Sequence, residues 1–195
     1  MPNKGFLLVT MQPPPALEEE FNAWYDTEHL PERLAVPGIL TALRFVCTDG
    51  HPRYLAMYDL ENFEVMNSPA YLKVAHDKSS PWTKRVTSRV KVWRSAGVQI
   101  APGNAITKQC ARVLLLRFRS LKAAAERDIV AGTKTAFEGR PEVIQTRVLA
   151  YDTGATGIDY IAFVELRWPL VEPFDHKAFG ANADKLDLVN MYAPY

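Results

Sequence analysis

Short apolar runs alternate with longer, helix-like segments through the first half of the chain. Four runs have the length and composition of strands: 5–11, 38–47, 53–60 and 86–94. Two segments have helical spacing: 16–30 and 68–78. Ser68 and Pro69 are residues typical of a helix start, and Pro31 predicts that the first helix ends near Leu30, because proline disfavours helical geometry in the residue before it. The predicted order is βαββαβ.

The same order returns in the second half. Residues 95–109 are rich in turn and loop residues, and we interpret them as a linker. Further strands are predicted over 111–118, 142–154 and 159–166, and a helix over 121–139. The last stretch, 173–195, would hold a shorter helix and a final strand. We therefore expect a first repeat at 1–95, a linker at 96–110 and a second repeat at 111–195.

A βαββαβ unit forms an antiparallel sheet with both helices on one face. The runs 5–11 and 111–118 are apolar on both faces, so each sheet needs a cover on its other side as well. The sequence thus predicts an α+β fold, in which two tandem ferredoxin-like units form a pseudo-dimer, with their antiparallel sheets packed face to face or closed into a barrel. The two sheets are expected to meet through residues 41–47 and 144–151. A homodimer of already doubled chains is the alternative.

The charge balance and the cysteine content limit which binding partners and which cellular compartment we expect. The 195 residues carry 23 basic and 22 acidic side chains, which argues against nucleic acid or an anionic membrane held by bulk charge. No run reaches the roughly 18 apolar residues of a membrane span, and the apolar start is too short for a signal peptide. Cys47 and Cys110 show no CxxC spacing, so we expect reduced thiols in a cytoplasmic protein.

The end of the first predicted helix is the candidate site. Trp24, Tyr25, Glu28 and His29 fall within six residues, just before Pro31. Helical spacing puts Glu28 one turn after Trp24 and His29 one turn after Tyr25. At the C-terminal end of a helix, burial and the helix dipole favour a neutral Glu28, and the dipole favours a protonated His29.

These positions give each residue a candidate role. Glu28 and His29 would transfer protons, the Tyr25 hydroxyl would donate to a substrate oxygen, and Trp24 would form a wall for a flat ligand. Structural roles compete with each assignment. Trp24 would then be plain core, Glu28 would pair with Arg33 or Arg44, and His29 would cap carbonyls at the helix end.

The predicted strands add candidates for substrate binding. Arg44 and Arg147 occupy matching mid-strand places in the two halves. A guanidinium inside a covered sheet needs an anion, either a ligand or a protein carboxylate such as Asp59 or Glu165. Arg44 is therefore a candidate for substrate binding. Tyr54 and Tyr58, which share one strand face, are the other two.

Metal and cofactor motifs are missing from the sequence. His51, His76 and His176 make no metal spacing with a second histidine or cysteine. Asp26 or Glu28 could bind a metal ion together with His29, but only with a further ligand from elsewhere. The chain has no glycine-rich phosphate loop and no Gly-x-Ser-x-Gly motif. We therefore expect neither a metal nor a cofactor.

The first half also resembles a known family. The segment FNAWYDTEHLPERLAVPGILTALRF, followed by YLAMYDLENFEVMNSPAYLK, is similar to EthD-like members of the dimeric α/β-barrel superfamily, which has a ferredoxin-like fold. Trp24, Tyr25 and His29 match the aromatic-rich W-Y-x-x-x-H segment of their first helix. The resemblance covers residues 1 to about 95, and the second half matches in fold pattern only. The superfamily includes monooxygenases, isomerases, cyclases, decarboxylases, dehydratases and haem proteins, so the resemblance supports the fold more than a reaction.

Two functions are expected from these observations. The first is a cofactor-independent enzyme that acts on a small cyclic or aromatic carbonyl compound by proton transfer, as a dehydratase, decarboxylase, cyclase or isomerase, with His29 as the acid or base. The alternative is a non-catalytic protein that binds a small molecule, or haem through His29. We expect the site in the first half only, because residues 121–139 contain no Trp, Tyr or His.

Overall fold

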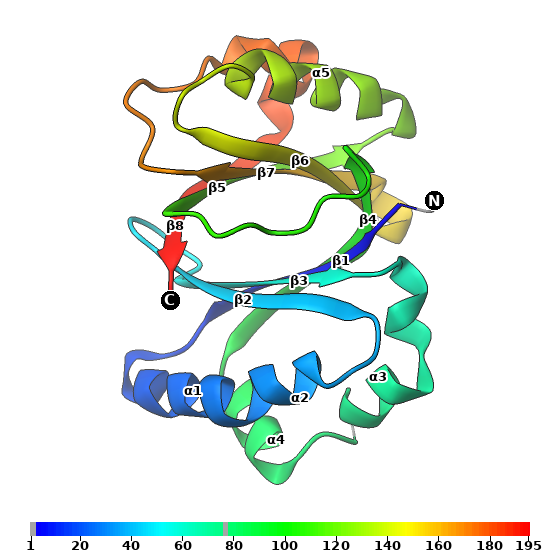
Figure 1. Cartoon of the computed structure of the whole chain (residues 1–195), viewed down its shortest axis with the longest axis vertical. Helices are drawn as coiled ribbons and strands as arrows, with labels where there is room; N and C mark the ends of the chain where they lie inside the picture. The colour runs from blue at the N-terminus through cyan, green and yellow to red at the C-terminus, as the bar shows by residue number, and fades with distance from the viewer. Residues whose placement is uncertain (1–2, 76–77) are drawn as a thin grey trace.

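Eight antiparallel strands close into a barrel (Figure 1). The computed structural model describes residues 3–75 and 78–195. The strands are β1 (Gly5–Gln12), β2 (Ile39–Cys47), β3 (Tyr54–Leu60), β4 (Lys91–Ala101), β5 (Arg112–Leu121), β6 (Val143–Asp152), β7 (Ile158–Leu166) and β8 (Leu186–Pro194). Their order around the barrel is β1-β3-β2-β8-β5-β7-β6-β4. The α+β class is thus confirmed, with the sheets closed into one barrel.

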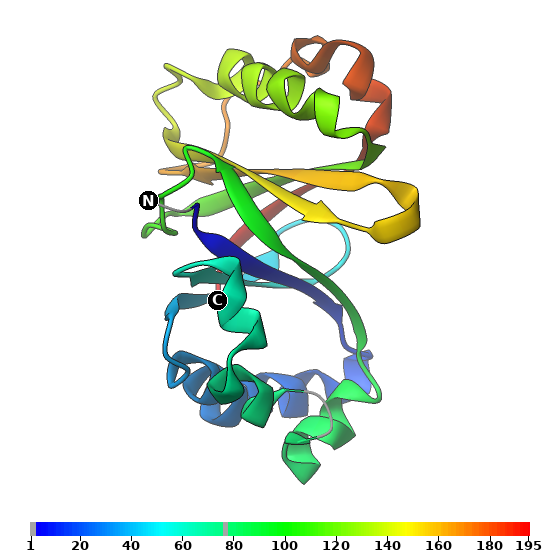
Figure 2. The ribbon, with the colours of Figure 1, turned by 90° about the vertical axis from the view of Figure 1, so that its right-hand side faces the viewer.

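Helices cover the two ends of the molecule. The α-helices are α1 (Glu18–Trp24), α2 (Leu30–Leu34), α3 (Pro69–Val74), α4 (Pro81–Thr87) and α5 (Glu126–Phe137). A π-helical turn, η2 (Tyr25–His29), joins α1 to α2. The 3₁₀ segments are η1 (Pro15–Leu17), η3 (Phe63–Asn67), η5 (Ala123–Ala125), η6 (Gly154–Thr156) and η7 (His176–Lys185). Figure 2 shows α1 to α4 over the strands of the first half, and α5 with η7 over those of the second.

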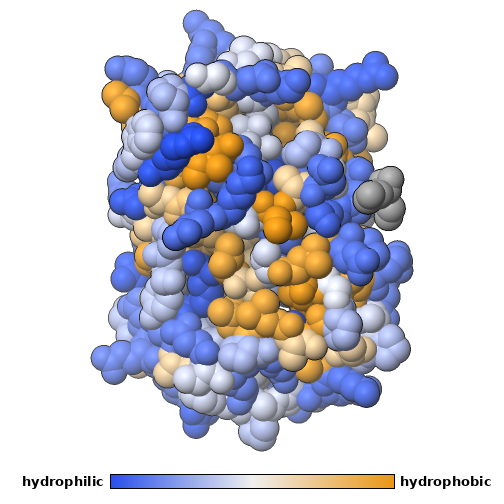
Figure 3. All heavy atoms as spheres, viewed as in Figure 1, coloured by the Kyte–Doolittle hydropathy of each residue, from blue (hydrophilic) through white to orange (hydrophobic). Residues whose placement is uncertain are grey.

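The strands are buried on both faces, as their composition predicts. In β1, Leu7 and Val9 face the helices and belong to the core beneath them. Phe6 and Leu8 point the other way and help to fill the barrel interior. In the space-filling view, hydrophobic residues gather over the middle of the molecule, between more hydrophilic ends (Figure 3). Among the described helices, none is long and apolar enough to cross a membrane.

Two short seams join the strands of the first half to those of the second. At one seam β2 pairs with β8, over Phe45 to Cys47, and at the other β4 pairs with β6, over Val98 to Ala101. The predicted meeting segments 41–47 and 144–151 are not hydrogen-bonded to each other. They do meet inside the barrel, where Phe45 and Cys47 share one hydrophobic cluster with Leu149.

A buried ion pair also links the halves. Arg147 is fully buried, and its Nη1 lies 2.6 Å from Asp59 Oδ1 on β3. Its Nη2 lies 3.2 Å from Glu165 Oε1 on β7 and donates to Thr107. The expectation that Arg147 pairs with a carboxylate on a neighbouring strand is confirmed.

Two segments differ from their predicted structure. Residues 81–87 form α4, where a strand was expected to begin at Val86. The Ser80 hydroxyl accepts a hydrogen bond from the Thr83 N–H, and Pro81 occupies the first turn, which together favour a helix. The strand β4 then continues to Ala101, where loop residues were expected from Ser95, because pairing with β1 and β6 stabilises an extended chain there.

The first helix does not end at Leu30, so that prediction is wrong. The Leu30 N–H donates to the carbonyl of Tyr25, five residues earlier, in the wide turn η2. In an α-helix, Pro31 would lack the N–H that donates to the carbonyl four residues earlier, and its ring would clash with that carbonyl. The wide turn η2 does not need this hydrogen bond. The chain therefore continues as α2 to Leu34.

Candidate functional site

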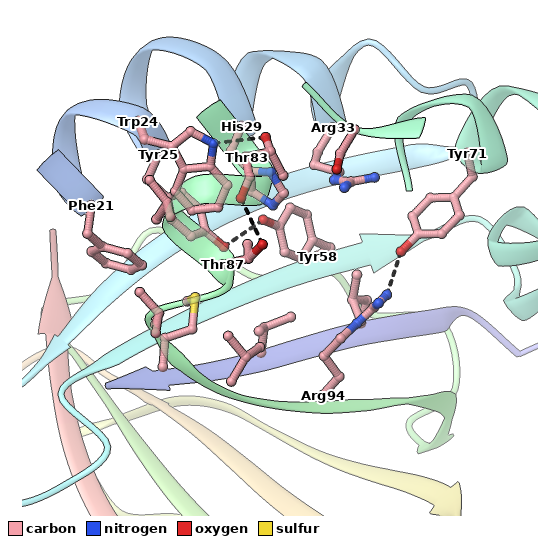
Figure 4. Close-up of a pocket in the computed structure, with 17 residues that line it drawn as sticks. Phe21, Trp24, Tyr25, His29, Arg33, Tyr58, Tyr71, Thr83, Thr87 and Arg94 are labelled. Carbon is pink, nitrogen blue, oxygen red and sulfur yellow. Dashed lines mark hydrogen bonds between the residues drawn. The ribbon is translucent and has the colours of Figure 1, made fainter. Parts of the chain in front are cut away.

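A cavity of about 440 Å³ lies under the helices of the first half. It is enclosed by α1, η2, α2, α3 and α4 on one side, and by β1, β3 and β4 on the other (Figure 4). The lining residues are Leu7, Val9, Met11, Phe21, Trp24, Tyr25, His29, Arg33, Tyr58, Tyr71, Ser79, Thr83, Val86, Thr87, Val90, Val92 and Arg94. Four of the residues predicted from the sequence, Trp24, Tyr25, His29 and Tyr58, are among them.

The aromatic wall of the cavity is fixed by hydrogen bonds. Trp24 is buried, and its Nε1 donates to Thr83 Oγ1 at 2.9 Å. The hydroxyls of Tyr25 and Tyr58 lie 2.9 Å apart and share a hydrogen bond. Phe21 contacts the edge of the Tyr25 ring, with centroids 5.5 Å apart. These contacts hold the rings in place, and the Tyr25–Tyr58 hydrogen bond uses only one of the two hydroxyl protons.

The turn η2 places His29 beside this wall. The imidazole packs against Trp24, with ring centroids 4.4 Å apart, and against Tyr25 at 5.0 Å. Its Nδ1 is buried and has no hydrogen-bond partner among the described residues. Turns of the π type often occur at functional sites, because the wide turn changes the direction of a side chain.

The imidazole of His29 is neutral over the physiological pH range. Its pKa is lowered to about 3, first by burial and then by the positive charges of Arg33, Arg94 and Arg44, in that order. The expectation that the helix dipole favours a protonated His29 is therefore wrong. The helix continues past His29, so its C-terminal pole lies elsewhere, and the charges near the ring are cationic.

The other end of the cavity is cationic. Arg33 is buried, and its guanidinium lies 5.3 Å from the ring centroid of Tyr71. Arg94 Nη2 donates to the Tyr71 hydroxyl at 2.7 Å. Figure 4 shows this group on the opposite side of His29 from Phe21 and Trp24. The cavity therefore has one aromatic end and one positively charged end.

Sequence reasoning missed both arginines, although signals for them exist. Arg33 follows His29 by one helical turn, but the helix was predicted to end before it. Arg94 alternates with Val92 and so shares its strand face, which is the face that lines the cavity.

Glu28 lies outside the lining residues. Its Oε1 accepts hydrogen bonds from the hydroxyls of Ser80 and Thr83, at the start of α4. Thr83 also accepts the Trp24 N–H, so Glu28 supports the wall of the cavity from behind. Proton transfer by Glu28 stays a prediction.

Arg44 and Tyr54 also lie beside the cavity rather than in its lining. Arg44 pairs with Asp26, donates to Asn22 Oδ1 at 2.6 Å, and lies 4.4 Å from the Tyr25 ring centroid. The Tyr54 hydroxyl accepts from Asn22 Nδ2 at 3.0 Å and donates to Glu18 at 2.6 Å. Both residues hold the helix α1 against the sheet, and their contact with a substrate stays a prediction.

Metal ligands do not come together in the described part of the chain. No group of three or more His, Cys, Asp or Glu side chains converges there. The two carboxylates near His29 in sequence are engaged elsewhere, Asp26 with Arg44 and Glu28 with Ser80 and Thr83. His51 contacts Gln12, His176 stacks on Phe174, and His76 lies outside the described residues.

Haem ligation through His29, the alternative taken from the family resemblance, does not fit these residues. A ligating histidine ordinarily donates its second ring N–H to a carboxylate, a carbonyl or water, which orients the ring. His29 makes no such hydrogen bond within the described residues, and the nearby charges of Arg33 and Arg94 are of the same sign as an iron ion.

The second half holds phenylalanine where the first half holds its cavity. Under α5, Phe137 packs on Phe174 with centroids 5.3 Å apart, and Phe118 packs on Phe179 at 4.7 Å. Gly132 of α5 allows the close approach, because a Cβ there would meet Phe179 Cδ1 at 2.6 Å. A site confined to the first half stays a prediction that this packing favours.

Comparisons with known proteins find similarity in structure. No family model matches the sequence, and no curated protein matches it. An anthrone oxidase-like protein is 10% identical, with a TM-score of 0.71, over 100% of this chain and 92% of that one. A putative monooxygenase from Lactobacillus acidophilus NCFM is 11% identical, with a TM-score of 0.57, over 99% and 93%. A chlorite dismutase from Candidatus Nitrospira defluvii is 10% identical, with a TM-score of 0.60, over 100% and 91%.

At these identities the similarity shows the fold alone, and membership of the dimeric α/β-barrel superfamily stays a prediction from the sequence resemblance. The EthD-like assignment within it stays a prediction. The similar structures are named as an anthrone oxidase-like protein, a putative monooxygenase and a chlorite dismutase, and none of these three as a dehydratase, decarboxylase, cyclase or isomerase. The expectation of a cofactor-independent dehydratase, decarboxylase, cyclase or isomerase is therefore wrong.

Proposed function

We propose that this chain is an enzyme that oxidises a small, electron-rich aromatic substrate with dioxygen in the cavity of the first half. The observation that carries the proposal is the half-buried, neutral imidazole of His29, whose Nδ1 is buried and has no hydrogen-bond partner among the described residues, beside a wall of aromatic rings. The names of the similar structures support an oxidative reaction. Enzymatic activity on a small molecule is part of this proposal.

The aromatic end of the cavity suits a flat ring. Phe21, Trp24 and Tyr25 contribute rings whose faces and edges can pack on an aromatic ligand. Burial raises the pKa of Tyr58 to about 12, so its hydroxyl stays protonated. One of the Tyr25 and Tyr58 hydroxyls donates to the other, and the remaining O–H can donate to an oxygen of the ligand on which negative charge develops.

The neutral imidazole can take the proton that starts the reaction. An acidic C–H beside an aromatic ring gives its proton to His29, and the electron pair left on carbon reduces dioxygen and forms a C–O bond. The resulting peroxide anion takes the proton back from His29 and becomes a hydroperoxide. Loss of the second C–H proton then breaks the O–O bond, so that a CH₂ group and O₂ become a C=O group and water. All atoms and electrons balance with dioxygen as the sole oxidant.

Oxygen uptake by the purified full-length protein tests this function. We would use anthrone and dihydroxynaphthalenes as substrates, follow O₂ with an electrode, and measure incorporation from ¹⁸O₂ by mass spectrometry. His29→Gln is expected to lower kcat by roughly 10²- to 10⁴-fold, the usual worth of a positioned acid or base. His176→Gln is the matched control, because that imidazole stacks on Phe174 in the other half.

A second variant separates the site from the core. Trp24→Ala removes a buried indole, and we expect a loss of about 3–5 kcal/mol in unfolding free energy. His29→Gln should instead leave the protein folded and inactive. If folded His29→Gln keeps full turnover, or if no probe consumes oxygen, the proposed function is wrong. A Soret band that appears with haem and disappears in His29→Gln would establish the haem alternative.

We also propose that the two halves are tandem ferredoxin-like units arranged as a pseudo-dimer. The barrel order reads β4-β1-β3-β2 for the first half and β8-β5-β7-β6 for the second, which is the same order in each. That repetition supports an internal duplication. Assembly of two such chains into a homodimer and a cytoplasmic location stay predictions.

A further inference from the structure

Among the described residues, no carboxylate forms an ion pair with Arg33. The described part of the chain contains three buried arginines: Arg33, Arg44 and Arg147. Arg44 pairs with Asp26, and Arg147 pairs with Asp59 and Glu165. Arg33 is 7% exposed, forms no ion pair with a described residue, and has a buried Nη1 without a hydrogen-bond partner. Because a buried, unpaired charge is costly, this position calls for an anion.

A second guanidinium points to the same place. Arg94 lines the cavity and donates to Tyr71, whose ring also lies 5.3 Å from the Arg33 guanidinium. The two cations thus converge on one tyrosine. No aspartate or glutamate lines the cavity, and the carboxylate of neighbouring Glu32 forms no ion pair with Arg33 within the described residues.

We propose that the cavity binds an aromatic carboxylate, with its carboxylate on Arg33 and Arg94 and its ring against the aromatic wall beside His29. The inference rests on the proposed function, and it names the substrate class. A guanidinium presents parallel N–H donors that match the two oxygens of a carboxylate. Figure 4 shows His29 and Tyr58 between the aromatic end and the arginines, so a ligand that spans both ends brings its ring to the imidazole.

Binding of such a ligand would also change the basicity of His29. Arg33 and Arg94 are the charges that most lower the pKa of His29, after burial. A bound carboxylate would offset both charges, and the pKa of His29 would rise toward its ordinary value. The imidazole would then become a stronger base only when the substrate is in place.

Binding of two matched probes to the full-length protein tests this proposal without turnover. We would measure the affinities of 2-naphthoate and 2-naphthamide, which share one ring system and differ in charge, by isothermal titration calorimetry. Charge-assisted hydrogen bonds predict that the carboxylate binds roughly 10- to 100-fold more tightly. Arg33→Gln should abolish this preference and change the affinity for the amide less than about threefold. Arg89→Gln, which removes an exposed positive charge outside the cavity, should leave the preference unchanged.

Folding of the variants is checked by thermal melting, and Arg94→Gln gives an independent second variant. Because Arg33 forms no ion pair within the described residues, Arg33→Gln is expected to melt no earlier than the wild type. Equal affinity of the two probes would overturn the proposal, and so would a carboxylate preference that both cavity variants retain. If the protein prefers the carboxylate probe but consumes no oxygen, the proposed function is wrong and this inference stands. If the protein takes up oxygen only with neutral aromatic substrates, this inference is wrong and the proposed function stands.

Discussion

The protonation of His29 differs between the folded and the unfolded chain. Its pKa in the folded protein is about 3, below the ordinary value of 6.5. Between these values the unfolded chain binds a proton that the folded protein does not. Acidification through this window therefore lowers the free energy of unfolding, by at most about 1.4 kcal/mol per pH unit for one proton.

The pH dependence gives a test of the buried imidazole. We expect urea unfolding of the wild type to lose stability from pH 6.5 toward pH 4 more steeply than that of His29→Gln. His176→Gln should follow the wild type, because that histidine is exposed. Parallel curves for the wild type and His29→Gln would show that the imidazole titrates alike in both states.

Residue types indicated the aromatic half of the cavity but not its charged half. Trp24, Tyr25 and His29 stood out because large amphipathic side chains clustered within one predicted helix, and all three line the cavity. Arg33 and Arg94 carried no such signal. An arginine is common on any surface, and its burial depends on how the helices pack above the sheet.

At the scale of elements, the turn η2 decides how α1 continues into α2. In an α-helix Pro31 would lose a hydrogen bond and clash with the carbonyl four residues before it, at a cost of about 3 kcal/mol. The wide turn avoids that clash and keeps Tyr25, His29 and Arg33 on the cavity side. A sequence rule that ends helices at proline cannot anticipate a turn of different width.

Deletion of Thr27 tests this account of the turn. Thr27 is exposed, and the hydrogen bond recorded for its side chain goes to the Ala23 carbonyl in the same helix. Removing one residue should convert η2 to α-helix and destabilise the protein by about 3 kcal/mol, and Pro31→Ala in the same chain should restore most of that. Thr27→Ala, which keeps the length, should change stability by less than about 0.5 kcal/mol. If the deletion lowers stability equally with proline and with alanine at position 31, this explanation is wrong.

Element order was predictable because strand and helix periods differ, but some boundaries were not. Ser68 and Pro69 correctly marked the start of α3, and Ser80 and Pro81 gave the same signal for α4. At α4 this signal competes with the alternation of apolar and polar residues from Val86 onward, which favours a strand. Closure into a barrel could not be deduced from either half, because it depends on pairing between distant strands.

At the scale of the whole molecule, the buried Arg147 connects strands from both halves. Arg147→Met would leave Asp59 and Glu165 buried without a cation, and we expect a loss of about 3–5 kcal/mol in unfolding free energy. Arg117→Met is the control, because Arg117 pairs with Asp187 in a partly exposed position and should cost no more than about 1 kcal/mol. Chemical denaturation measures both. A loss below about 1 kcal/mol for Arg147→Met would mean that the carboxylates find other partners.

The two seams that close the barrel have a consequence for how the protein behaves on dilution. Each seam joins strands on opposite sides of the segment 102–111, so this segment acts as a tether between β4 and β5. A short tether holds its two ends at an effective concentration of about millimolar, whatever the amount of protein in solution. The seams can therefore be short and still stay closed at dilutions where two separate chains with the same contacts would part.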